Sequence, residues 1–467
     1  MIALLIVSAL QDPAGVANDA LLRHSSERHI VNIRQLTFGG QNAEAYWNAD
    51  GTKIIYQTTQ PEWPDEQIMV MNADGSGKTL VSSGEGRCTC GYFLPNGEIV
   101  YSTTDWKDPR PAPKPDMSKG YVWRVNPLFG IFRGKEDGER RRKLLGNGKH
   151  YYAETTVAPN GKFMTFTSTR DGDLEIYRSD LFGRNIERLT DNEGYDGGPF
   201  VSWDSQKIVF RRDLIESEKE REDYRALLKE HLVRPSKLEI WIMDANGKNQ
   251  RQVTKLGAAS FAPFLHPNNK QIIFSSNVGD PKGREFDLYM IDVDGTSLQR
   301  ITFTPKFDGF PMFTRDGKRL IWAGNRNAKV RGETNIFVAD WVENAPEPPA
   351  PPAPGGTRRV RVGLIPDYAD QGPGLLLSGV GEGSPAEKGG LKAGDRIIEW
   401  GDKKIASIED IQYIFETAEP GQAVQVTVVR DGNEVILTVT PEHPTGRNVE
   451  APLWLAKHLL GFASWLS

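Results

Sequence analysis

Short apolar runs separated by Asn, Asp and Gly turn residues recur along residues 34–341. One half of the repeat is clearest at 47–54, where Asn48, Asp50 and Gly51 stand between two apolar stretches, and it returns with variation from Phe93, Val157, Val201, Leu265 and Phe313. Turn residues between two β-rich runs are typical of a hairpin. Each copy therefore predicts two antiparallel strands joined by a tight turn.

The second half of the repeat is a strand, a polar turn and a basic strand. Its first copy occupies residues 68–75, and its counterparts begin at Val122, Ile176, Ile240, Leu288 and Ile336. Supersecondary units that recur at a regular spacing indicate a repeat architecture. Six hairpins of each kind predict six four-stranded units and an all-β fold.

A third pattern of the Arg-x-Leu-Thr type marks the outer strand of each unit. Copies stand at 34–37, 187–190, 251–254 and 299–302. The first copy precedes the first inner strand, whereas the last unit, which ends near Trp341, has none. We therefore expect residues 34–37 to complete the sixth unit and close a ring, which shelters strand edges that would otherwise aggregate.

These repeats resemble those of TolB-like β-propellers. The resemblance implies a six-bladed propeller over residues 30–342, with residues 1–29 as a lead-in. An open β-sandwich and a solenoid are the alternatives.

Two long segments interrupt the repeat spacing between the second and third strands of units two and four. Residues 105–120 are rich in Pro and Lys, and residues 213–237 contain a charged helix with Tyr224, Leu227 and Leu228 on one side. Equivalent loops rise from the same rim of a propeller. This rim is therefore the surface that we expect to bind a protein or small ligand.

Carboxylates lie near the start of several inner strands on that face: Glu44, Glu154, Asp196 and Asp308. If they converge on the axial channel, they could bind a divalent cation or a basic group. The alternative is that they satisfy local turn amides or are simply solvated. The seven His show no metal-ligand spacing, and no other cofactor is expected.

A Pro-rich stretch at 343–356 predicts an extended linker, followed by a second domain at 357–444 and an apolar tail at 445–467. The phrases 374–380 and 383–398 resemble the bacterial PDZ family over residues 359–441. The resemblance implies a small α+β domain that binds peptide C-termini. It places the carboxylate loop at Gly374, Leu375 and Leu376.

The same resemblance places the peptide-pairing strand at 376–380, including Leu377 and Ser378. Helix 407–417, with Ile411 and Phe415 on its apolar side, is expected to form the other wall of the groove. A PDZ domain used only for packing is the alternative.

Residues 363–368 also resemble PDZ domains of secreted zinc aminopeptidases, and TolB-like propellers occur with PDZ modules in tricorn-like proteases. The chain has neither a Gly-x-Ser-x-Gly elbow nor a His-Glu-x-x-His motif. The leading interpretation is a non-catalytic binding or scaffold protein of the cell envelope. The alternatives are an accessory or partial protein of a peptidase system and a hydrolase with its site at the channel.

Composition adds few constraints. The net charge of -5 is spread without long single-sign blocks, which argues against nucleic acid or an anionic membrane surface as partner. Residues 1–10 are apolar and resemble a clipped secretory signal, so we expect a periplasmic or secreted protein. The apolar tail at 452–466 is shorter than a membrane span, and Cys88 and Cys90 are expected to be free thiols.

Overall fold

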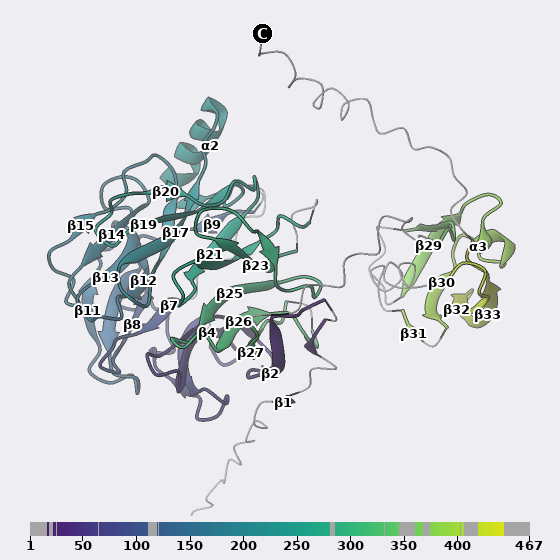
Figure 1. Cartoon of the computed structure of the whole chain (residues 1–467), viewed down its shortest axis with the longest axis horizontal. Coiled ribbons are helices and arrows are strands. Elements are labelled where there is room, and N and C mark those ends of the chain that lie inside the picture. The colour runs from purple at the N-terminus through teal and green to yellow at the C-terminus, as the bar shows by residue number, and fades with distance from the viewer. Residues whose placement is uncertain are drawn as a thin grey trace, which may run out of the picture. The chain divides into compact units, whose positions relative to one another are not determined.

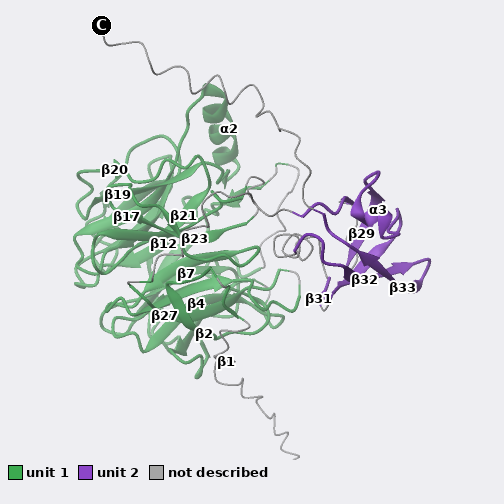
Figure 2. Cartoon of the chain, turned by 45° about the vertical axis from the view of Figure 1, so that its right-hand side comes forward, with its two compact units in different colours: residues 1–346 green, residues 347–467 purple. Residues whose placement is uncertain are grey.

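The computed structural model describes residues 16–17, 22–24, 26–63, 65–110, 119, 121–280, 285–330, 332–343, 345, 360–367, 374–401, 403–405 and 419–442 (Figure 1). Predictions on other residues, including the terminal segments 1–10 and 452–466, lie outside this part of the chain. The chain divides into two compact units, residues 1–346 and 347–467 (Figure 2), and each is described by itself.

The first unit contains six antiparallel four-stranded blades. The strands of blades 1 to 3 are β3 (Gln41–Trp47), β4 (Lys53–Thr59), β5 (Gln67–Asn72) and β6 (Thr79–Leu80); β7 (Cys88–Phe93), β8 (Ile99–Thr103), β10 (Gly130–Gly134) and β11 (Arg142–Leu145); β12 (Tyr152–Val157), β13 (Met164–Ser168), β14 (Glu175–Ser179) and β15 (Glu187–Arg188). Those of blades 4 and 5 are β16 (Asp196–Val201), β17 (Lys207–Asp213), β19 (Leu238–Asp244) and β20 (Arg251–Gln252); β21 (Ser260–Leu265), β22 (Gln271–Ser276), β23 (Asp287–Asp292) and β24 (Gln299–Arg300).

Blade 6 joins the two ends of the repeat region. Its strands are β25 (Asp308–Phe313), β26 (Arg319–Gly324), β27 (Asn335–Trp341) and β2 (Ile30–Gln35), and β1 (Val16–Ala17) pairs with the outer edge of β2. In the antiparallel ladder between β2 and β27, Ile30 lies opposite Trp341 and Gln35 opposite Phe337. The predicted closure of the ring by the N-terminal strand is confirmed.

The Arg-x-Leu-Thr pattern has a hydrogen-bonding cause. The hydroxyl oxygen of its last residue accepts a hydrogen bond of 2.8–2.9 Å from a backbone N–H of the third strand, at Thr37, Thr190, Thr254 and Thr302. The Gln or Arg two positions earlier donates back to the carbonyl of the same threonine, as Arg300 does to Thr302 at 2.9 Å. The apolar residue between them is buried. The pattern thus continues the outer strand pairing, which in blades 3 to 5 is a ladder of only two residue pairs.

The two insertions meet each other. The first insertion extends beyond residue 120, because the next blade strand is β10, and its strand β9 (Trp123–Arg124) pairs antiparallel with β18 (Leu232–Val233) of the second insertion. This confirms that both rise from one rim and corrects one part of the repeat reading. Val122 does not begin the third strand of blade 2, because that role belongs to β10, which pairs with β8 and β11.

Helix α2 (Glu218–Lys229) precedes β18 in the second insertion. A capping box starts the helix, since the Ser217 side chain accepts from Glu220 N–H while the Glu220 carboxylate accepts from Ser217 N–H. Of the three residues expected on one side of the helix, Tyr224 and Leu227 are buried, and the Tyr224 hydroxyl donates to Asp173 of the propeller. The helix is therefore fixed to the blades through its apolar side.

The second unit is a small sheet in the order β28 (Leu364–Pro366), β29 (Leu375–Val380), β30 (Arg396–Trp400), β32 (Val424–Arg430) and β33 (Asn433–Val439). β31 (Lys403–Lys404) pairs with β30, and the short helix α3 (Pro385–Lys388) follows β29. Leu377, Ile397 and Val426 are fully or almost fully buried in its core. The Asp of the Gly-Asp motif, Asp395, forms an ion pair with Arg430 at 2.6 Å and accepts from Lys392 N–H, which fixes the turn into β30.

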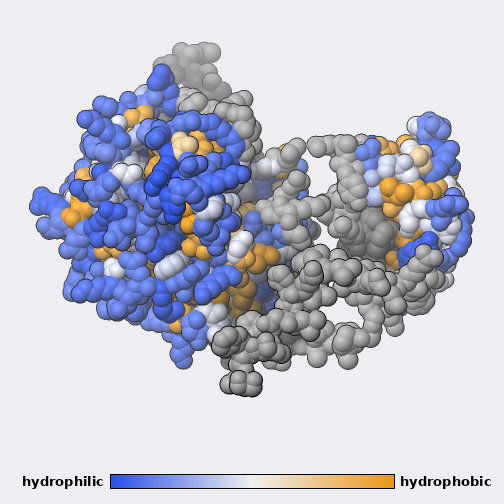
Figure 3. Space-filling view, turned by 90° about the horizontal axis from the view of Figure 1, so that it is seen from above, coloured by the Kyte–Doolittle hydropathy of each residue, from blue (hydrophilic) through white to orange (hydrophobic). Residues whose placement is uncertain are grey.

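Hydrophilic residues predominate on the propeller face that Figure 3 shows, with hydrophobic residues in patches between them. Among the described residues, no helix combines the length and the apolar character that crossing a membrane requires.

Candidate functional site: an axial cavity and a strand edge

All six inner strands of the propeller share one irregularity. Each has a register shift against its neighbour, and each has one residue with a φ between 48° and 58° at that bulge. These residues are Glu44, Cys90, Glu154, Gly198, Ala262 and Phe310. Bulges of this kind redirect side chains and are frequent beside functional sites.

The six bulge residues all line one cavity of about 800 Å³ inside the propeller. Every blade contributes to its wall, and so do both insertions, through residues 121–125, Leu232 and Pro235. The volume lies within the range of pockets that enclose small ligands. The bulges and the paired insertions therefore line one continuous cavity that opens to solvent.

Glu154 is the centre of the polar side of the cavity. Its carboxylate accepts hydrogen bonds from Tyr151, Tyr195, Arg211, Thr167 and the N–H of Gly198. Burial alone would raise the pKa of Glu154, but the charge of Arg211 and these hydrogen bonds hold the pKa below its ordinary value. Glu154 is therefore an ionised group whose charge is already matched within the protein.

Glu44 has a different environment on the same side of the cavity. Burial raises the pKa of Glu44 to about 7. Repulsion from Glu154 also raises this pKa, whereas a hydrogen bond with the Cys90 thiol lowers it. Arg211, whose charge favours ionisation of Glu44, is already bonded to Glu154 at 3.0 Å. Among the described residues, no Lys or Arg forms an ion pair with Glu44.

Glu66 and Arg87 complete the polar side as a self-neutralised pair. Arg87 Nη2 lies 2.8 Å from Glu66 Oε1, its Nε also bonds Glu66, and Asp65 lies 3.8 Å from Nε. Glu66 and Asp65 thus share Arg87 as their cation, whereas Glu44 forms no ion pair with any described Lys or Arg.

The opposite wall is aromatic. Phe261 contacts Phe286 and Phe310 with ring centroids 5.2 and 5.5 Å apart, and Phe307 lies 6.2 Å from Phe286. Trp123 of the first insertion adds an edge-on contact to Phe261 at 6.1 Å. The cavity thus has an acidic side formed by blades 1 to 3 and an apolar side formed by blades 5 and 6.

The other two predicted channel carboxylates, Asp196 and Asp308, do not line the cavity. They stand two residues before the bulge, where the side chain turns into the blade and meets an arginine of the same blade. Asp196 forms two bonds of 2.6 Å with Arg212, and Asp308 bonds Arg326 at 2.9 Å. The structure therefore does not gather the four carboxylates, and the part of the chain that it describes holds no cluster of three or more metal-ligating groups.

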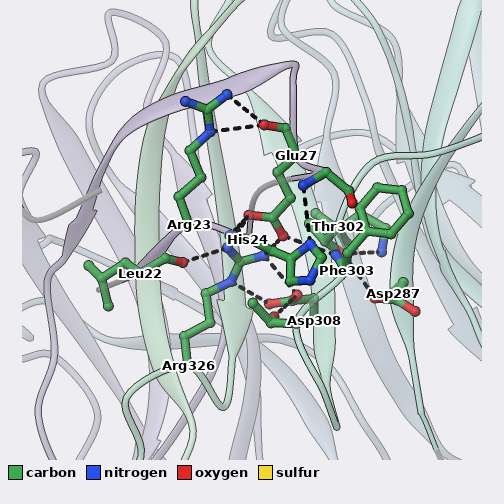
Figure 4. Close-up of polar contacts among 12 residues, drawn as sticks. Leu22, Arg23, His24, Glu27, Asp287, Thr302, Phe303, Asp308 and Arg326 are labelled. Carbon is green, nitrogen blue, oxygen red and sulfur yellow. Dashed lines mark hydrogen bonds and ion pairs between the residues drawn. The ribbon is translucent and has the colours of Figure 1, made fainter. Parts of the chain in front are cut away.

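Arg326 also attaches the N-terminal lead-in to the propeller (Figure 4). Its guanidinium bonds both oxygens of Glu27 at 2.7 and 2.8 Å and the carbonyl of Leu22 at 2.9 Å. Glu27 further accepts from the N–H groups of His24 and Phe303, both at 3.0 Å. Asp308 is thus a structural anchor in this arrangement.

In the second unit, the predicted residues Gly374, Leu375, Leu376, Leu377 and Ser378 lie in or beside β29. Gly374 has a φ of +91°, and a Cβ added there would lie 2.6 Å from the Ile397 carbonyl, so glycine is needed for close packing against β30. Leu375 and Leu376 pair with β30, while Leu377, Gly379 and Val380 pair with β28. Ile411 and Phe415 lie outside the described residues.

These pairings correct one part of the PDZ interpretation. β29 lies between two strands and has no free ladder for a peptide, because both of its sides are occupied. The edges of the described sheet are β28 and β33, and β28 is the edge beside β29. Ser378 supports that edge, since its hydroxyl donates to the carbonyls of Ile365 and Pro366.

Sequence reasoning missed Arg211, Arg326 and Trp123. The signal for the first was present, because Arg211 and Arg212 interrupt the apolar strand β17 and are both more than nine-tenths buried. A buried arginine requires an acidic partner, and the inner strands supply it. Trp123 was assigned to a blade strand instead of the cavity wall.

Comparison with known proteins agrees with the two-part organisation. The family model described as the PDZ domain matches residues 363–440. A DegP-like protein of Marinomonas, described as a probable periplasmic serine endoprotease, is 41% identical over 73 residues, which are 16% of this chain and 16% of that protein. This chain therefore spans about a sixth of that relative's length.

Two further similarities cover more of the chain. The uncharacterized protein Atu1656 of Agrobacterium fabrum is 23% identical over 269 residues, which cover 53% of this chain and 78% of that protein. The TolB structure from Acinetobacter baumannii covers 65% of this chain and 64% of its own, with 18% identity and a TM-score of 0.43. The strand order shows a six-bladed propeller in the first unit, and the family match places a PDZ domain at residues 363–440 of the second.

Proposed function

We propose that this protein is a non-catalytic binding protein of the cell envelope. Its PDZ domain captures the C-terminal segment of a peptide or protein, and its propeller holds a second ligand. The PDZ match at 363–440 supports the first role, and the cavity of the propeller supports the second.

The open edge at β28 is the observation that carries the peptide role. Gly381 N–H bonds the Gly363 carbonyl at 2.8 Å, so the backbone groups of the next residue, Leu364, face the opposite side of the strand. Within the described sheet, no strand occupies that side of β28. An extended peptide can pair there, which is the recognition mode of PDZ domains.

The envelope location is supported by the DegP-like relative, whose description places it in the periplasm and whose similarity is confined to 16% of this chain. A periplasmic or secreted location is therefore part of the proposal. Fractionation of the native cells tests it, and recovery of the protein wholly from the cytosol would contradict it.

Peptide binding is best tested with the full chain and chemically altered peptides. A hydrophobic C-terminal peptide should bind at least about tenfold more tightly with a free carboxylate than as its amide. N-methylation of alternate peptide residues should weaken binding in an alternating pattern, because only every second amide faces β28. Equal binding of all these peptides would refute pairing at this edge.

The matched protein variants are Leu364→Pro and Leu364→Ala. Proline removes the one N–H that Leu364 offers to the open side, whereas alanine keeps it. We expect only Leu364→Pro to lose peptide binding. Cleavage of the bound peptide by the wild-type chain, on prolonged incubation, would contradict the non-catalytic assignment.

A further inference from the structure

The propeller cavity has two chemically distinct walls, and the difference between them indicates what it binds. On one side Glu44 faces the cavity without an ion-pair partner among the described residues, and on the other four phenylalanines and Trp123 form a continuous aromatic surface. The neighbouring acids are already matched, Glu154 by Arg211 and Glu66 by Arg87. A ligand that completes this site therefore brings one positive charge.

We propose that the cavity binds a protonated amine attached to an aromatic or flat apolar body, with Glu44 as the counter-ion. The proposal deepens the role suggested above for the propeller and rests on it. The apolar body packs on the wall that includes Phe261, Phe307 and Phe310. The amine reaches Glu44 and replaces the water that this carboxylate would otherwise need.

The charges of the cavity argue against an anionic ligand. Four acids line the cavity, Glu44, Asp65, Glu66 and Glu154, against three arginines. Of these arginines, Arg87 and Arg211 are held in bonds to Glu66 and Glu154, and Arg124 is exposed on β9, so an anion would meet an excess of negative charge. A neutral ligand would leave Glu44 unpaired in a partly buried position, which costs free energy whenever the group is ionised. A cation matches both walls, because it pairs with Glu44 and is also attracted to aromatic faces.

Two kinds of ligand carry a protonated amine on an aromatic body: a free aromatic amine, and the N-terminus of a peptide that begins with an aromatic residue. Tryptamine is the probe for the first, and a tryptophanyl-glycine amide with a free N-terminus is the probe for the second. Binding of the dipeptide comparable to that of tryptamine assigns the site to peptide N-termini. Binding of tryptamine alone assigns it to free amines, and either result supports recognition of the amine.

Isothermal titration of the full chain provides the test, with N-acetyltryptamine as the neutral analogue and indole-3-acetate as the anionic one. We expect tryptamine to bind at least about tenfold more tightly than the acetylated amine and indole-3-acetate not to bind. Equal affinity for the charged and neutral analogues, or no binding of either amine probe, would overturn the proposal.

Two cavity variants and one surface control locate the site of recognition. Glu44→Gln should weaken tryptamine binding at least about tenfold, while Glu139→Gln, at an exposed hairpin of blade 2, should not change it. Phe307→Leu keeps an apolar wall but removes one ring, and should weaken binding by about threefold. Unchanged tryptamine affinity in Glu44→Gln would refute the role of that carboxylate.

Folding of the variant is not a confounder, because glutamine has the shape of the protonated acid that burial already favours at position 44. Binding of the C-terminal peptide to the PDZ domain, measured on the same Glu44→Gln sample, should be unaltered. Loss of amine binding alone therefore concerns the cavity. If the wild-type chain did not bind the C-terminal peptide, the proposed PDZ role would be refuted instead.

Discussion

Replacing Arg326 by methionine should destabilise the propeller more than any other single change in the N-terminal anchor. The side chains of Glu27 and Asp308 are 0% exposed and that of Arg326 is 2% exposed, so no solvent reaches this group of charges. Methionine would remove every charge-assisted bond and leave two carboxylates buried without a counter-ion. Breaking a buried ion pair in this way costs about 3–5 kcal/mol, and we expect a loss of at least about 4 kcal/mol in the free energy of unfolding.

The loss should depend on pH in a direction that follows from the structure. Burial already raises the pKa of Asp308 in spite of the opposing charge of Arg326, and without that charge the pKa rises further. A carboxyl group with a raised pKa in the folded state contributes stability at low pH that is lost as the pH rises. The deficit of the variant should therefore be smaller at about pH 5 than at about pH 8.

Urea unfolding of the full chain at both pH values, with hydrogen exchange of β25 and β26 as the local readout, measures both effects. Glu27→Gln is the milder control, because Arg326 keeps its ion pair with Asp308 and the amide oxygen of the new side chain can still accept a hydrogen bond. This change should lower the free energy of unfolding by about 1–2 kcal/mol. It also preserves the test if the methionine variant does not fold. A loss below about 1 kcal/mol in Arg326→Met, or a deficit that grows toward low pH, would refute the reasoning.

Three further changes test other parts of the structure. Thr254→Val removes the hydroxyl that accepts from Ile240 N–H at 2.8 Å, so it should cost about 1–3 kcal/mol in urea unfolding, whereas Ser76→Ala, in an exposed turn, should be nearly neutral. Deleting residues 30–36 should lower the melting temperature and cause aggregation, because β27 loses its partner; unchanged melting and solubility would contradict ring closure. The pKa of Glu44 is about 7 in the folded state. The free energy of unfolding of the wild type should therefore fall by about 2 kcal/mol relative to that of Glu44→Gln as the pH rises from about 5 to about 8. A relative gain in stability over this range would contradict the burial of Glu44.

The blade architecture could be predicted because each repeat has its own local signal. Turn residues mark the hairpins, and the threonine of the outer strand bonds the neighbouring strand directly. The third strand of blade 2 was misplaced because residues 122–124 do form a strand, but one that pairs with β18 of the other insertion. Local sequence shows that a segment is extended, but it does not show which distant segment is its partner.

The cavity was only partly predictable for a related reason. Glu44 and Glu154 were correctly associated with the inner strands, but the bulge that turns them toward the axis has no residue signature, since Glu, Cys, Gly, Ala and Phe all occupy it. Asp196 and Asp308, only two positions earlier in their strands, are bonded to buried arginines instead. In the PDZ domain, the sequence pattern identified the strands, while the open edge depends on their order in the sheet.

The ring closure also determines how the protein bears a pulling force. Ile30 at the start of β2 lies opposite Trp341 at the end of β27, so tension between the N-terminal segment and the linker would open this ladder from its end, one bond at a time, instead of shearing all bonds together. His29 reinforces that end by stacking on Trp341 with centroids 4.8 Å apart and by contacting the Val342 carbonyl at 2.9 Å. The contacts that precede the strand, between β1 and β2 and from Arg326 to Leu22 and Glu27, would take the load first. The mechanical strength of the ring thus depends on a few polar contacts at the end of the ladder between β2 and β27. A tethered partner that pulls on the chain would break these contacts before the inner strands of any blade unfold.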